Sequence, residues 1–153
     1  MIIVGERLRN LAALAVPVGK ATHASVDVTL SSTLMVQRPN MGKPIDLANL
    51  PEEHEMYGEV SIARYPYIIA PGEFFKATLA EHIFMPNDVV AMFTLRSRMA
   101  QVGLEQSTSV WIRPNWSGVL VLELTNLSKS NMLVSAGLAV GQLHFFDADD
   151  SVL

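Results

Sequence analysis

Short apolar runs separated by Gly and Pro turns constrain the fold of this chain more than any other feature. The runs are rich in Val, Ile, Leu and Phe, and the first of them alternates polar and apolar residues. They lie at residues 25–30, 67–70, 89–95, 119–125 and 138–146. Many short strands with little helix are typical of a β-sandwich or a β-barrel, so the sequence predicts an all-β domain.

Two short helical segments are expected beside the strands. Leucine and alanine recur on one face over residues 6–15, and Pro17 and Gly19 then end the pattern. A second short helix is expected over residues 97–102, before Gly103. The segment 38–58 is rich in proline and charged residues and is predicted to be a loop. Within the run at 138–146, Gly141 predicts a bulge or a close approach of two backbones.

The size and composition of the chain predict one folded domain. It has 153 residues, of which 50% are hydrophobic and 17% are charged. A chain of this length can bury a sizeable core, and a disordered chain would show the opposite balance of apolar and charged residues. We therefore assign residues 1–153 to a single domain, with a helical or extended N-terminal arm at 1–21 and a short tail at 147–153.

Charge and cysteine content exclude several classes of function. The formal net charge of −4 gives no positive field that would attract nucleic acid or an acidic membrane. The absence of cysteine excludes disulfides, Cys-ligated zinc and a thiolate nucleophile, and the four histidines show no metal-ligand spacing. The N-terminal sequence does not resemble a signal peptide, and no apolar run is a membrane helix. We therefore expect no metal, no nucleic-acid partner and no membrane partner, and a cytoplasmic or virion location.

Glu123 is the first candidate for chemistry. On the run at 119–125, strict alternation places Glu123 on one face and Leu120, Leu122 and Leu124 on the other. A carboxylate among apolar neighbours is desolvated, which raises its pKa toward the range useful for general acid or base catalysis. A carboxylate paired with Arg or Lys, or exposed on an outer face, would have no such role, and the residues alone leave both interpretations open.

Two longer segments carry a family resemblance. Leu95-Arg-Ser-Arg-Met-Ala-Gln-Val-Gly-Leu104 is similar to the pattern Gly-Arg-Ser-Ser-Leu-Ala-Arg-x-Gly-Leu. Ile112-Arg-Pro-Asn-Trp-Ser-Gly-Val-Leu-Val-Leu-Glu123 is similar to Ile-Asp-Pro-Gly-Trp-x-Gly-x-Ile-x-Leu-Glu. Both patterns belong to the dCTP deaminase branch of the trimeric dUTPase superfamily, which the chain resembles over roughly residues 22–146.

The resemblance implies a fold, an assembly and a site. The family fold is a distorted, jelly-roll-like β-barrel, assembled as a homotrimer with nucleotide sites between subunits. By residue-for-residue match, Glu123 would activate water for attack on cytosine C4 without a metal, and Ser97 would hold that water. Arg96 matches a phosphate-binding Arg, and Trp116 lies in the turn before the strand that carries the Glu. Mg²⁺ would enter only with the nucleotide triphosphate.

Several functional positions depart from the family pattern. Gln101 replaces an Arg of the catalytic constellation, so a fixed positive charge is lost. Arg98 replaces a Ser near the expected phosphate, and Arg113 replaces an Asp that contacts the sugar. Asn115 replaces a Gly, which is tolerable because Asn adopts the left-handed region readily. Family enzymes also continue well past the position of Phe146 and close that tail over the triphosphate, so we expect weak nucleotide binding here.

Two functions follow from this combination. The favoured one is a non-catalytic trimer with a degraded nucleotide site. Such a trimer would serve as a structural protein, for example a viral capsid decoration or cement protein. It could instead serve as a decoy that binds dCTP, dUTP or dTTP. The alternative is an active, metal-independent dCTP deaminase that converts dCTP to dUTP and ammonia. In that case Glu123 and Ser97 are catalytic, Arg96 and Trp116 contact the substrate, and Arg98 or Arg113 supplies the missing cation. Hydrolysis of dUTP is disfavoured because the required Asp is Arg113.

Overall fold

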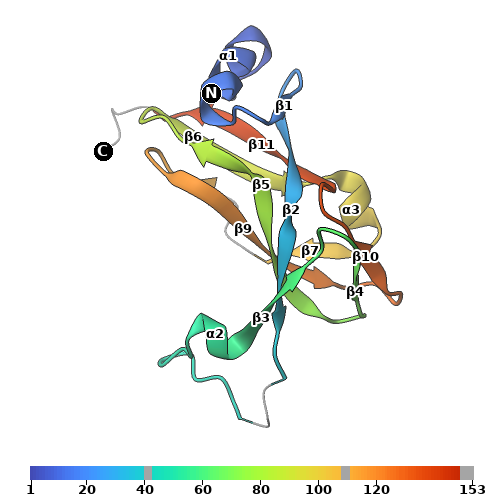
Figure 1. The fold of residues 1–153 in the computed structure, drawn as a ribbon. Helices are drawn as coiled ribbons and strands as arrows, with labels where there is room; N and C mark the ends of the chain where they lie inside the picture. Colours follow the sequence, from blue (N-terminus) through green and yellow to red (C-terminus); the bar gives the residue numbers. More distant parts are fainter. Residues whose placement is uncertain (40–42, 108–110, 149–153) are drawn as a thin grey trace.

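A computed structural model describes residues 1–39, 43–107 and 111–148. These residues form a mostly β fold with short helices (Figure 1). The helices are α1 (Gly5–Ala15), α2 (Glu53–Met56) and α3 (Ser97–Gln101). The strands are β1 (Lys20–Ala21), β2 (Val26–Gln37), β3 (Tyr57–Ser61), β4 (Tyr67–Ile69), β5 (Phe74–Phe84), β6 (Val89–Leu95), β7 (Leu104–Gln106), β8 (Trp111–Ile112), β9 (Ser117–Asn126), β10 (Met132–Val134) and β11 (Ala139–Asp147).

One curled antiparallel sheet dominates the fold. Its strand order is β7-β9-β5-β2-β11-β6-β8, and β1 and β3 also pair with β2. Strands β4 and β10 form a small second sheet. Figure 1 shows α1 at one end of the long strand β2 and α2 at the other end, on a segment that projects from the body. The curled sheet forms a half-barrel, in agreement with the barrel-type fold that the sequence predicted.

The core fills the inner face of the curled sheet. Val26, Val28 and Leu30 of β2 are all buried, as their alternation predicted. Phe75, Phe93 and Phe145 come from three different strands and are among the largest fully buried side chains of the described residues. Burial of such apolar surface is the main favourable term in folding, so these strands hold the barrel in its curled form.

Gly141 of β11 packs directly against Phe93 and Thr94 of β6. The register of β11 on β2 shifts between Ala139 and Gly141, which confirms the predicted irregularity. A Cβ atom on Gly141 would lie 2.4 Å from a ring carbon of Phe93 and 2.4 Å from the carbonyl oxygen of Thr94. Only a residue without a side chain fits at this position.

Some elements differ from the sequence-based expectation. The apolar face of α1 is confirmed, but the long strand β5 was not predicted, because Lys76, Glu81 and His82 interrupt its apolar pattern. Glu81 is nevertheless buried, and it accepts hydrogen bonds from the backbone N–H and the hydroxyl of Thr29. The predicted loop at 38–58 contains α2, and Asp147, assigned to the tail, is the last residue of β11. Residues 149–153 of the expected tail lie outside the described residues.

An exposed ion pair fastens α1 to the end of β11. Arg7 donates through Nη1 to Oδ2 of Asp147 at 3.0 Å, and its Nη2 also contacts Oδ1. This hydrogen bonding lowers the pKa of Asp147 from its ordinary value of 3.8.

We expect the Arg7→Gln variant to raise the pKa of Asp147 toward that ordinary value. Because the folded-state pKa is depressed, the pair stabilises the fold above about pH 4 and its contribution is lost as pH falls through the folded-state pKa. NMR titration of the side-chain carboxyl group measures the shift directly. An unchanged titration midpoint in the variant would contradict the assignment of the shift to Arg7.

Membrane spans and metal clusters are both missing from the described part of the chain. Over residues 1–39, 43–107 and 111–148, no helix has the length and apolarity needed to cross a membrane. Within the same ranges, no group of three or more His, Cys, Asp or Glu side chains is placed to hold a metal ion.

Candidate functional site

Glu123 lies on the outer face of β9, opposite the core of its own chain. Its neighbours Leu122 and Leu124 are fully buried on the inner face, as the alternation predicted. Glu123 itself is half-buried, and its Oε2 atom is shielded from solvent. The carboxylate therefore stands on a partly covered outer surface rather than in the interior of the barrel.

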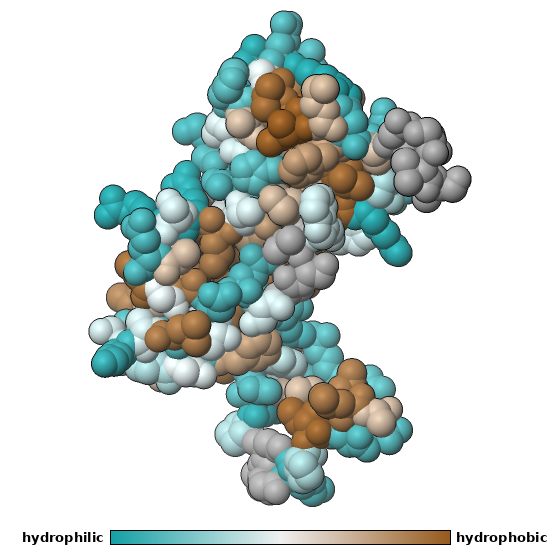
Figure 2. Space-filling model, turned by 180° about the vertical axis from the view of Figure 1, so that it is seen from behind, coloured by the Kyte–Doolittle hydropathy of each residue, from teal (hydrophilic) through white to brown (hydrophobic). Residues whose placement is uncertain are grey.

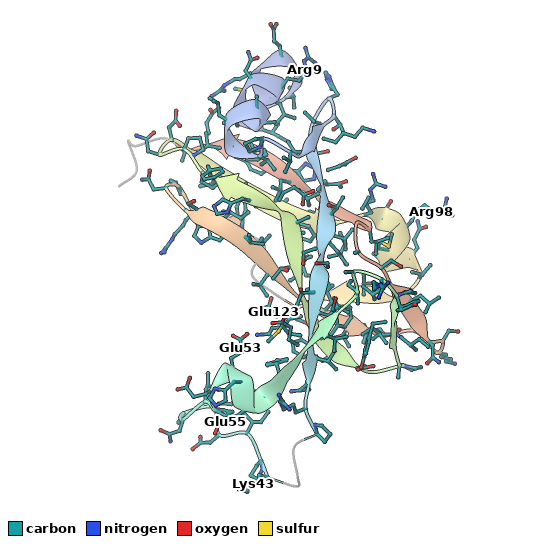
Figure 3. The ribbon with its side chains drawn as sticks, viewed as in Figure 1. Arg9, Lys43, Glu53, Glu55, Arg98 and Glu123 are labelled. Carbon is teal, nitrogen blue, oxygen red and sulfur yellow. The ribbon has the colours of Figure 1, made fainter. Side chains whose placement is uncertain are left out.

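A lysine and a tyrosine stand beside this carboxylate. Lys76 of β5 is the cross-strand neighbour of Glu123. Its Nζ atom lies 3.1 Å from Oε1 of Glu53 in α2 and 4.2 Å from the ring centre of Tyr57. Figure 3 shows Glu53 and Glu123 close together where α2 meets the sheet. The cluster Glu53, Tyr57, Lys76 and Glu123 therefore joins the projecting segment to the strand that carries the candidate catalytic residue.

The cluster changes the acidity of Tyr57. Burial raises the pKa of this phenol above its ordinary value of 10.0, and the negative charges of Glu123 and Glu53 raise it further. We expect the Glu123→Gln variant to lower the pKa of Tyr57, because one of the nearby negative charges is removed. The ultraviolet absorbance of tyrosinate, followed against pH with Tyr57→Phe as the reference, measures this change. An unaltered midpoint would show that Glu123 does not act on Tyr57.

The second group of candidates lies on and beside α3. Ser97, Arg98 and Gln101 are exposed. Ser97 and Gln101 are four residues apart, and Arg98 and Gln101 are three apart, so Gln101 neighbours both of these side chains on the helix surface. Figure 3 shows Arg98 well separated from Glu123 in the same chain. A single copy of the chain therefore does not bring Glu123 and the α3 residues together.

Arg96, the residue before α3, is held by the sheet. Its Nη2 atom lies 3.0 Å from Oδ2 of Asp27, and the Asp27 side chain is 17% exposed. Gln142, the cross-strand neighbour of Asp27, uses its side-chain amide to donate a hydrogen bond to the hydroxyl of Thr94, so the strands around this ion pair are also joined by side-chain contacts. An anionic ligand at Arg96 would therefore compete with a carboxylate that already occupies one edge of the guanidinium group.

Arg113 and Trp116 lie in a third place, at the turn between β8 and β9. Asn115 has a φ of 60°, the left-handed conformation that the sequence predicted for it. The turn borders a pocket of about 480 Å³. The pocket is lined by Val90, Trp111, Ile112, Arg113, Pro114, Trp116 and Leu120. Trp116 packs partly against the core, whereas Trp111 is 57% exposed.

Sequence reasoning missed some residues at these places. Trp111, Lys76, Tyr57 and Glu53 were not singled out, although each lies beside a predicted site residue. Trp111 stands two residues before Arg113 in an alternating segment, which is a signal that could have placed both on one face. The Glu53–Lys76 contact joins a predicted loop to an unpredicted strand, so no local pattern indicated it.

A comparison with protein families identifies the relatives of the chain. The family model described as dCTP deaminase-like matches residues 4–148. The chain belongs to the dCTP deaminase-like family. Among curated members, a dCTP deaminase of Actinobacillus pleuropneumoniae is 34% identical over 134 residues, covering 82% of this chain and 69% of that protein. A dUMP-forming dCTP deaminase of Leifsonia xyli is 32% identical over 129 residues, covering 84% of this chain and 64% of that protein.

Comparison with solved structures shows which fold this dCTP deaminase-like chain has. The dCTP deaminase of Agrobacterium tumefaciens superposes with a TM-score of 0.71 at 20% identity, over 94% of this chain and 47% of that one. The EIAV dUTPase gives a TM-score of 0.50 at 22% identity, over 61% of this chain and 77% of that one. This confirms the predicted dUTPase-type β-barrel fold. The chain spans about half the length of the solved dCTP deaminase.

Proposed function

We propose that this dCTP deaminase-like chain forms a non-catalytic homotrimer with a structural role in a larger assembly. A viral capsid, with the chain as a decoration or cement protein, is one such assembly. The family resemblance supports the threefold arrangement, since it places the nucleotide site between subunits. Glu123 and the α3 residues lie apart in one chain, which fits a site that needs a second copy.

The face of α3 that carries Ser97 supports the loss of catalysis. The family pattern has a catalytic Arg four residues after this Ser, and the chain has Gln101 there. Gln101 can still form hydrogen bonds, but it carries no fixed positive charge at this position. Loss of one electrostatic group from a catalytic site typically lowers the rate by about 10²–10³-fold.

Two further contacts agree with this proposal. Arg96, the match to a phosphate-binding residue, is paired with Asp27. Glu123 lies in a cluster with Lys76, Tyr57 and Glu53, which links two elements of the fold. Arg96 therefore has an ion-pair partner within its own chain, and Glu123 has polar neighbours there, which supports a structural role for both.

An active dCTP deaminase is the second candidate. Glu123 and Ser97 are both present at the matching positions, and the curated relatives at 34% identity are dCTP deaminases. In that mechanism Glu123 would take a proton from the attacking water and later deliver one to the leaving ammonia. Arg98 or Arg113 of a neighbouring copy would supply the missing positive charge, and Mg²⁺ would accompany the triphosphate.

Ammonia release from dCTP separates the two candidates. We expect the purified full chain, with dCTP and Mg²⁺, to release no more ammonia than the Glu123→Gln variant. A rate that exceeds this control, and that rises further when Gln101→Arg is introduced, would establish the deaminase and refute the non-catalytic proposal. Analytical ultracentrifugation of the same samples tests the homotrimer, and a monomer at all concentrations would refute it.

Calorimetric titration then separates a structural protein from a nucleotide decoy. The proposal predicts no binding of dCTP, dUTP or dTTP at micromolar concentration. Saturable binding of one of these nucleotides without turnover would instead establish a decoy, and Arg96→Ala would be expected to weaken it.

A further inference from the structure

The segment 43–52 projects from the body of the molecule and exposes large aliphatic side chains. Within this arm, Ile45 is 41% exposed, Leu47 is 83% exposed and Leu50 is 68% exposed. Figure 2 shows a hydrophobic patch on the projecting part at the bottom of the view. Large contiguous apolar patches on the surface of a folded domain mark sites of contact with another molecule.

The arm has a defined local shape. The carboxylate of Asp46 accepts hydrogen bonds from the backbone N–H of Ala48 at 2.9 Å and from Nδ2 of Asn49 at 3.0 Å. These bonds lower the pKa of Asp46, so it is charged at neutral pH. Pro44 and Pro51 fix the backbone on either side. The arm therefore presents aliphatic groups beside a negative charge, and its hydrogen bonds and prolines restrict the backbone before binding, which lowers the entropy lost on binding.

The pocket beside β8 has the complementary chemistry. Val90, Trp111, Trp116 and Leu120 give it an apolar lining, and Arg113 is the cation among its lining residues. Aromatic grooves bind proline and aliphatic side chains well, and an arginine at the edge of such a groove selects an acidic segment. The pocket thus matches the arm in both apolar character and charge.

The arm cannot fill the pocket of its own chain. It follows the end of β2, where Val36 pairs with Phe75 of β5, and Phe75 pairs with Leu124 of β9. The pocket lies at the other end of β9, next to Ser117, which pairs with Phe84. Seven residues of strand at about 3.3 Å each place the two ends about 20 Å apart. Any contact between arm and pocket therefore joins two copies.

We propose that the arm 43–52 of one copy docks into the Trp111–Arg113–Trp116 pocket of the next. Leu47 and Leu50 pack on the two indole rings, and Asp46 pairs with Arg113. A head-to-tail contact of this kind closes into a ring when repeated by a rotation axis. The inference rests on the proposed homotrimer and adds the contact that joins its subunits.

Tryptophan fluorescence offers a direct readout, because both tryptophans of the chain line the pocket. We expect the full-length Leu47→Asp/Leu50→Asp variant to show red-shifted emission and stronger acrylamide quenching than the wild-type chain. Leu133→Asp is the matched control, since Leu133 is 66% exposed on β10, away from arm and pocket. Emission and quenching that match the wild type in the arm variant would overturn the proposal.

A charge exchange tests the polar half of the contact. Arg113→Asp should weaken association of the copies at least tenfold. Adding Asp46→Arg in the same chain should recover part of that loss, because it restores the charge pair but removes the hydrogen bonds that Asp46 accepts within the arm. Arg9→Asp, a change at an exposed position on α1, is the control and should leave association unchanged (Figure 3). Equal effects of the single and double variants would refute the pairing of these two residues.

The oligomeric state separates failure of this contact from failure of the proposed trimer. A trimer that survives Leu47→Asp/Leu50→Asp with unaltered fluorescence would keep the assembly and refute the arm contact. A wild-type chain that is monomeric at every concentration would refute both. Loss of the trimer in the arm variant, with a native circular dichroism spectrum and the fluorescence shift, is the result expected.

Discussion

The Gly141→Val variant should lose about 3 kcal/mol or more of unfolding free energy. A Cβ atom at this position would meet the Phe93 ring at 2.4 Å and the Thr94 carbonyl oxygen at 2.4 Å. Strand β6 supplies both groups, and β11 lies between β6 and β2 in the sheet. Relief of the clash therefore requires the two strands to separate, which breaks the middle of the sheet. Urea unfolding followed by circular dichroism measures the loss.

A glycine in another strand provides the matched control. Gly58 of β3 has room for a side chain, because an added Cβ would meet only atoms of the Arg38 side chain at 3.8 Å. The Gly58→Val variant should change the unfolding free energy by no more than about 0.5 kcal/mol. Similar losses in the two variants would show that valine is poorly tolerated in any strand and would contradict the argument from contact with β6.

The double variant Gly141→Ala/Phe93→Leu separates the two sources of the clash. Leucine is shorter than phenylalanine and removes the ring contact, but the contact with the Thr94 carbonyl remains because it belongs to the backbone. The stability of the double variant should therefore stay below that of Phe93→Leu alone. Full recovery would show that only the ring opposes a side chain at Gly141.

The strands that the sequence predicted are those whose apolar residues alternate with polar ones or follow one another without interruption. Residues 89–95 were predicted as a buried strand and form β6 with the same bounds. β5 escaped prediction because its outer face carries Lys76 and His82, and because Glu81 is buried with hydrogen bonds from Thr29. The local hydropathy pattern does not show that a carboxylate is buried when its hydrogen-bond donors lie on a distant strand. The secondary structure of such a segment is therefore determined by tertiary contacts.

For the candidate site, too, the sequence predicted some features and not others. The alternation around Glu123 and the left-handed Asn115 followed from residue types alone, and both are present in the structure. The partners of these residues did not follow, because Lys76 and Asp27 are brought to Glu123 and Arg96 by strand pairing. Sequence patterns therefore identify which residues share a face, while register determines which charges meet.

The Asn126→Ala variant should lose about 3 kcal/mol of unfolding free energy, because it leaves several buried groups without partners. The fully buried side chain donates to the carbonyl oxygens of Ile69 and Ser130 at 3.0 and 2.8 Å. Its Oδ1 atom accepts from the backbone N–H and the hydroxyl of Ser128 at 3.0 and 2.8 Å. Asn126 thus attaches the end of β4 to the end of β9.

Amide hydrogen exchange shows which strands lose stability in the variant. In Asn126→Ala, protection should fall first in β4 and β10, which form the small sheet next to Asn126, before it falls in β2 or β6. Asn87→Ala removes an exposed side chain and is the control, with an expected change of no more than about 0.5 kcal/mol. A uniform loss of protection over both sheets would show that Asn126 supports the fold as a whole.

The Asn126→Asp variant distinguishes lost hydrogen bonds from lost volume. Aspartate keeps the size of the side chain and can still accept from Ser128, but its carboxylate faces the carbonyl oxygens of Ile69 and Ser130. Burial and these oxygens oppose ionisation, so the folded-state pKa of the introduced carboxyl group is raised, and its protonated form can donate one of the lost bonds. The variant should therefore gain stability relative to wild type as pH falls below neutral. A variant as stable as the wild type at every pH would mean that volume alone accounts for the role of Asn126.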